Sequence, residues 1–370
     1  MDADATSTQT CKILLLAYRL ADRFQADEVS KVLKSALDQV QQADVHTDLI
    51  SLFFCLQPSV RESLGDFEKK CTGQLVSIFG DVPAVIRSPD LTAQFISLPQ
   101  AAALVWVQQD GLTVHSENCV VYLLMAWVNE NKSMCKEQLK ELVDNVRAVN
   151  LSTSYLVGTL PTLEFFGDCK GMRYITHLLH FKAGTEIDMA MSWPRDGPTA
   201  WIKGSRTLSP EAEDGVAVEL SLTPAEITSS IPEHLIDNQE WLIKSSPPLY
   251  FNGYWIQPAL MGEWLSATTE VREGRFHVWS GFKYLDYYPY NDITAAQGLS
   301  DGFKATLVTK IQVPSRLTFK ILGKLSFVMH WSKNFYDLIL DGPSDSHFTQ
   351  LFTPYLINDQ AKFIFVARAE

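Results

Sequence analysis

The sequence contains none of the short motifs that organise nucleotide binding or nucleophilic catalysis. It has no G-x-G-x-x-G, no G-x-x-x-x-G-K-[ST] and no G-x-S-x-G. Any chain of 370 residues holds enough Ser, His and Asp to assemble an imagined triad, so their presence alone does not indicate catalysis. The sequence therefore predicts a protein that is not an enzyme.

Positive charge and long apolar runs are also scarce. The chain has 31 Lys and Arg against 43 Asp and Glu, a formal net charge of -12, which argues against binding nucleic-acid phosphates or an anionic membrane. The first ten residues lack a basic stretch, and the apolar run Ile13 to Ala17 is too short for a signal-peptide core or a membrane span. We expect a soluble cytoplasmic or nuclear protein without a cofactor, whose partners are proteins or small molecules.

Cysteine is sparse and its spacing is uninformative. The six cysteines (Cys11, Cys55, Cys71, Cys119, Cys135 and Cys169) form no C-x-x-C pair and no zinc-like pattern. Cys55, Cys71 and Cys119 lie in apolar helical contexts without a nearby cation that would favour a thiolate, so we expect them to be inert. A reducing compartment fits this usage best.

His177 and His180, with Cys169 nearby, leave a metal-dependent hydrolase open as an alternative. If residues 162–184 form a helix, the two imidazoles at i and i+3 could share a metal ion. If they form a strand, the same side chains point to opposite faces. A solvated or core histidine pair is the simpler interpretation, and no metal site is predicted.

Glycine and proline mark a change of character near residue 155. Together they number 8 in residues 1–154 and 28 in residues 155–370. The first part has helical periodicity: the set Ile13, Leu16, Ala17, Leu20 and Phe24 and the set Val29, Val32, Leu33, Ala36, Leu37 and Val40 form two stripes that we expect to be buried. Further helices are predicted at 47–56, 60–80, 90–97 and 99–108, with Pro58, Pro83, Pro89 and Pro99 as starts or breaks.

Residues 110–147 have the pattern of two amphipathic helices joined by a short polar turn. Ser116 is a plausible N-cap, and Glu117 is favourably placed at the positive end of the helix dipole. One apolar face is expected from Val120, Leu123, Leu124, Trp127 and Val128, and a second from Leu139, Leu142, Val143 and Val146. Such a pair is predicted to pack antiparallel in a helical core.

The second part predicts an antiparallel β sandwich. Its aromatic and β-branched runs lie at 250–261, 275–284, 303–313, 316–322, 324–331, 334–340 and 362–369. Long loops or an insertion are expected near 205–248. The sequence has no Gly-Gly pair and no repeat of 20 to 50 residues, which disfavours a kelch propeller.

A tyrosine-rich stretch follows the second of these runs. Tyr284, Tyr287, Tyr288 and Tyr290 supply large, stiff, amphipathic contact area, so they are the candidate protein-binding residues. The alternative is that Tyr284 and one of Tyr287 or Tyr288 belong to the core while the others stack on a turn.

The helical part resembles the BTB-BACK family. The run LLLAYRLADRFQADEVSKVLKSAL (14–37) is similar to the last two helices of a BTB domain, so residues 1–45 are interpreted as a truncated BTB domain. The pieces FEKKCTGQLVSIFGDV, FISLP, DGLTV-SEN, AWV and KEQLKELVDNVR follow in the order of a BACK domain, assigned to residues 46–155. Met134, Cys135 and Lys136 stand where the family has an Arg ahead of its last helix pair.

The second part, residues 156–370, resembles the C-terminal domain of plant light-response BTB-BACK proteins, which is akin to the MATH/TRAF sandwich. The likeness is carried by SSPPLYFNGYWIQPAL, RFHVWSGFKY and FTPYLINDQAKFIFVARAE. The resemblance implies an α+β multidomain, non-enzymatic adaptor that recognises substrates for a cullin-RING ubiquitin ligase: the sandwich binds the target and the helices contact cullin. The alternative is a cullin-independent scaffold.

Overall fold

The structure is a computed structural model, and it describes residues 3–132, 134–153, 155–156, 172–182, 193–231, 239–251, 253–265, 275–284, 303–313, 318–329, 335–343, 356 and 360–369. The chain divides into two compact units. The helical unit comprises Met1–Leu151 and Leu163–Leu208, and the strand unit comprises Ser152–Thr162 and Ser209–Glu370. The amino-acid composition changes once along the chain, near residue 155. The two units do not follow that single boundary, because residues 163–208 belong to the helical unit.

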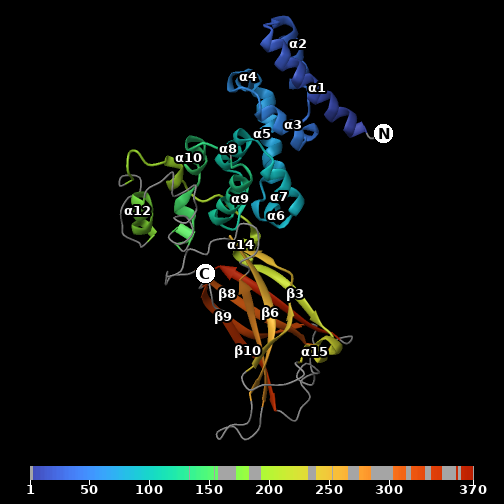
Figure 1. Cartoon of the computed structure of the whole chain (residues 1–370), viewed down its shortest axis with the longest axis vertical. Helices are drawn as coiled ribbons and strands as arrows, with labels where there is room; N and C mark the ends of the chain where they lie inside the picture. Colours follow the sequence, from blue (N-terminus) through green and yellow to red (C-terminus); the bar gives the residue numbers. More distant parts are fainter. Residues whose placement is uncertain are drawn as a thin grey trace. The chain divides into compact units, whose positions relative to one another are not determined.

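The helical unit is built from short helices, coloured blue to green in Figure 1. Their bounds are α1 Ala3–Arg23, α2 Asp27–Asp38, α3 Thr47–Phe54, α4 Pro58–Ser63, α5 Gly65–Phe79, α6 Val82–Arg87, α7 Pro89–Ile96, α8 Gln100–Gln108, α9 Glu117–Glu130, α10 Lys136–Val143 and α12 Met172–Lys182, with 3₁₀ turns η1 Gln42–Asp44, η2 Ala148–Asn150 and η5 Thr199–Ile202. These helices confirm the prediction that the first part of the chain is helical.

Among the residues described, no helix combines the length and the apolar character needed to cross a membrane.

Prolines and side-chain caps set several helix starts. Pro58 and Pro89 occupy the first position of α4 and α7, and Pro83 lies in the first turn of α6. The Asp81 side chain accepts a hydrogen bond from the Ala84 amide at 3.1 Å, and Ser88 accepts one from the Leu91 amide at 3.3 Å. A proline here removes an amide that has no helical partner, which is why it starts a helix without breaking it. The predicted helix 60–80 is instead two helices, α4 and α5.

Two tryptophans organise the core of the helical unit. Trp106 and Trp127 are fully buried, and each indole donates a hydrogen bond to a backbone carbonyl: Trp106 to Phe79 O at 2.9 Å and Trp127 to Leu98 O at 2.8 Å. Phe95 packs edge to face against Trp106, with ring centroids 4.6 Å apart. Each indole therefore buries a large apolar surface and also satisfies a backbone carbonyl, at the end of α5 for Trp106 and in the connection between α7 and α8 for Trp127.

The helix α9 is buried on all sides over most of its length. Every residue from Glu117 to Trp127 is buried, so the single apolar face predicted for this helix is too narrow. It packs against α6, α7 and the short strand β1 (Thr113–Val114), while α10 packs against α8. The two helices were predicted to pack antiparallel, but neither has the other among its main packing partners. The main partners of α9 are instead elements that precede it in the chain.

The strand unit contains two antiparallel sheets, drawn in yellow to red in Figure 1. The strands are β3 Val216–Leu222, β4 Gln239–Ser245, β5 Leu249–Phe251, β6 Tyr254–Leu265, β7 Arg275–Tyr284, β8 Phe303–Val313, β9 Thr318–Met329, β10 Phe335–Pro343 and β11 Ala361–Ala369. One sheet has the order β10-β7-β6-β4 with β5 paired to β6, and the other has the order β3-β11-β8-β9. The predicted strands 316–322 and 324–331 form the single strand β9, whose pairing with β8 is offset beside Gly323.

Residues 205–248 contain regular elements where long loops were expected. The helices α14 (Pro210–Asp214) and α15 (Pro224–Ser230) lie here with β3 and β4. Thr223 and Glu226 form a capping box at the start of α15, a local hydrogen-bonding pattern that favours a helix in a polar stretch.

Lys244 of β4 donates hydrogen bonds to Glu226 at 2.5 Å and to Ser221 O of β3 at 2.8 Å. The Lys244 ammonium lowers the pKa of the Glu226 carboxyl, and this contact ties an edge of one sheet to an edge of the other.

Candidate functional site

The hairpin formed by α1 and α2 exposes an apolar face. Gln25, with a φ of 55°, and a hydrogen bond from the Ala26 amide to Ala21 O at 2.8 Å close the turn between the two helices. Leu15 and Leu37 are fully buried inside the hairpin and its contacts. Six apolar residues of this hairpin are exposed, and together they are called the apolar hairpin face: Ile13, Leu16, Leu20, Phe24, Val29 and Val32.

This exposure contradicts the expected burial for most of the first N-terminal stripe and for Val29 and Val32 of the second, whereas Leu37 of the second stripe is buried as expected. Phe24 is 74% exposed and Val32 is 69% exposed. The helix α1 packs on α3, and its buried residues are a different set that includes Cys11 and Tyr18. The Tyr18 hydroxyl lies 2.9 Å from Ser63 Oγ of α4. Because the stretch is apolar on more than one side, its periodicity could not show which stripe faces α3.

The apolar hairpin face has the composition of a protein interface. It holds six of the eight large apolar side chains found exposed in the part of the chain that the structure describes. Exposed charges of both signs lie on the same two helices: Arg19, Asp22, Arg23, Asp27, Glu28, Lys31 and Lys34. Exposed apolar side chains accompanied by charged ones are typical of a protein-binding surface, and soluble monomers rarely leave large apolar patches uncovered.

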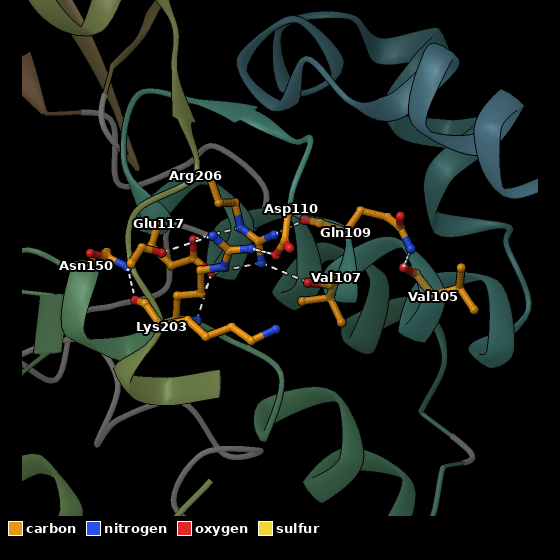
Figure 2. Close-up of polar contacts among 10 residues, drawn as sticks. Val105, Val107, Gln109, Asp110, Glu117, Asn150, Lys203 and Arg206 are labelled. Atoms are coloured by element: carbon orange, nitrogen blue, oxygen red, sulfur yellow. Dashed lines mark hydrogen bonds and ion pairs between the residues drawn. The ribbon is translucent and has the colours of Figure 1, made fainter. Parts of the chain in front are cut away.

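A second feature is a buried ionic cluster in the same unit, the Arg206 cluster, formed by Asp110, Glu117, Arg147 and Arg206 (Figure 2). The Arg206 side chain is 0% exposed and that of Glu117 is 1% exposed. Arg206 donates from Nε to Glu117 Oε2 at 2.9 Å and from Nη2 to Glu117 Oε1 at 3.2 Å. This is the forked geometry in which guanidinium and carboxylate bind most strongly.

The remaining guanidinium donors of Arg206 bind the end of α8. Nη2 donates to Val107 O at 2.8 Å and Nη1 donates to Gln109 O. These carbonyls lie at the C-terminal end of a helix, where the backbone leaves acceptors without helical partners and where the dipole favours a cation. Arg206 thus caps α8 and neutralises Glu117 at the start of α9 with one side chain.

Arg147 is the second cation of the Arg206 cluster. Its amide donates to Glu117 Oε1 at 2.9 Å, and its guanidinium donates to Gly204 O at 3.0 Å and to Asp110. Burial, followed by the positive charge of Arg206, lowers the pKa of the Arg147 guanidinium, while Glu117 and Asp110 oppose that shift. One buried carboxylate therefore compensates two cations, with help from a carboxylate at the surface.

The sequence predicted the position of Glu117 at the start of a helix but not its ion pair. Ser116 does occupy the N-cap position of α9, and Glu117 does begin the helix. Its pairing with Arg206, 89 residues away, carries no local signal, because Arg206 lies in a polar stretch that resembles any surface loop. The charged groups of the arrangement are paired with one another or with backbone groups, which gives the arrangement a structural role.

The predicted binding tyrosines fall at the edge of the described structure. Tyr284 is the last residue of β7, where it pairs with Ile256 of β6. Tyr287, Tyr288 and Tyr290 lie outside the described residues. Their role in target binding stays a prediction.

The histidine pair lies on a helix. His177 and His180 belong to α12, so the strand interpretation of this segment is wrong. The His177 ring lies against Trp193, with centroids 6.5 Å apart, which fits a histidine of an aromatic cluster. Cys169 lies outside the described residues. Within the described parts of the chain, no group of three His, Cys, Asp or Glu residues could hold a metal ion.

The thiols differ in accessibility in a way that the sequence did not show. Cys11, Cys71 and Cys119 are buried, but Cys55, at the end of α3, is exposed together with Cys135. The exposure of Cys55 therefore contradicts the apolar environment expected for it. Burial raises the pKa of the Cys11 and Cys71 thiols, which suppresses the reactive thiolate further.

We accordingly expect a maleimide probe to modify Cys55 and Cys135 of the folded chain at least about tenfold faster than Cys11, Cys71 or Cys119. Peptide mapping by mass spectrometry measures each rate. In denaturant, the five thiols should react at similar rates. Fast native labelling of Cys71 would contradict the burial of α5.

Comparison with known proteins agrees with the helical architecture. Residues 86–160 match the family model of the BACK domain, described as BTB And C-terminal Kelch. No curated protein matches the chain. The matched residues run from the end of α6 through α7, α8, α9 and α10, and they include Asp110, Glu117 and Arg147 but not Arg206. This region of the chain is therefore similar to the BACK domain, and the match supports a relation to BTB and BACK proteins.

Proposed function

We propose that the protein is a non-enzymatic interaction adaptor that recognises substrates for a cullin-RING ubiquitin ligase. The observation that carries the proposal is the apolar hairpin face, which lies in the same unit as the BACK-like residues 86–160. BTB and BACK proteins are typically adaptors without catalytic activity, and their helices supply the contacts with partners. In this proposal, cullin covers the apolar hairpin face.

The strand unit is the proposed target-binding part. Its strand order supports a MATH-like sandwich, because the chain moves from one sheet to the other between β3 and β4, between β7 and β8, between β9 and β10, and between β10 and β11. Such repeated crossing builds two sheets together as one body. The tyrosine-rich stretch that begins at Tyr284 is the proposed recognition surface. A cytoplasmic or nuclear location and the likeness to plant light-response proteins belong to the same proposal.

The test is binding of the full chain to a purified cullin of the class that serves BTB proteins, measured by calorimetry. We expect the double substitution Leu20→Asp and Phe24→Asp to weaken binding at least about tenfold, because both charges would be buried in the interface. The matched control is Leu242→Asp, which places a charge at a 52% exposed apolar position on β4.

Two results would reject this function. One is no measurable association between the full chain and cullin under conditions in which an intact BTB protein binds. The other is association that the double substitution leaves unchanged. The first result, combined with capture of a target by the strand unit, would favour the second candidate, a scaffold without a ligase connection, for which the same exposed face is the supporting observation.

A further inference from the structure

We draw no further inference here: the strongest candidate, the aromatic cluster that Tyr174 and His177 of α12 form with Trp193 and Trp201, carries nothing beyond the packing of the helical unit, because its rings lie against one another with centroids 5.8 to 6.5 Å apart and Trp201 is fully buried, with its indole N–H already bonded to Val143 O.

Discussion

Replacing Glu117 by alanine is expected to lower the free energy of unfolding of the helical unit by about 3–5 kcal/mol. The substitution leaves the guanidinium of Arg206, which is 0% exposed, and that of Arg147, which is 6% exposed, without their shared carboxylate. Two buried cations then repel each other where water cannot screen them. Urea unfolding followed by far-ultraviolet circular dichroism measures the loss.

The matched control for this prediction is Glu28→Ala. Glu28 also lies in the first turn of a helix, α2, and also accepts from a cation, Lys31 at 2.8 Å, but that pair is exposed. An exposed pair of this kind contributes at most about 1 kcal/mol. Equal effects of the two substitutions would mean that the Arg206 cluster is no more than a surface ion pair. A larger loss for Glu117→Ala than for the Glu117→Met and Arg206→Met pair is the signature of an unpaired buried charge.

Replacing Trp127 by alanine is the second substitution with a large expected effect, a loss of about 3–5 kcal/mol in the free energy of unfolding. The indole lies in the part of α9 that is buried on every side, and its removal leaves a cavity there. The substitution also removes the donor that satisfies Leu98 O at 2.8 Å. The same urea titration measures this loss.

Phe24→Ala supplies the comparison, because it removes a large aromatic ring that is 74% exposed. Surface substitutions of this kind usually change stability by less than about 0.5 kcal/mol. We therefore expect the two truncations to differ by several kcal/mol although each deletes one ring system. Comparable losses would show that the apolar hairpin face is covered in the folded protein and would remove the basis for a free docking surface.

The two predictions concern different kinds of stabilising contact in the helical unit. Trp127 stabilises α9 through volume and a single hydrogen bond, whereas Arg206 stabilises the approach of a segment that is distant in the sequence.

The sequence by itself determined the helical first part, most of its helix starts and the existence of strands in the second part. These depend on local chemistry: proline in a first turn, as at Pro58 and Pro89, needs no distant partner, and alternating aromatic and β-branched residues favour strands wherever they occur. The BACK likeness could also be seen locally, and residues 86–160 match that domain.

Only the tertiary structure decided which apolar surface is buried and which charges meet. Periodicity identifies a stripe on a helix but not its partner, so it could not show that Leu15 faces inward while Leu20 faces solvent. The ion pair between Glu117 and Arg206 spans 89 residues and appears in no local pattern. Burial and long-range pairing are properties of the folded chain, because each depends on which distant residues fill the space around a side chain.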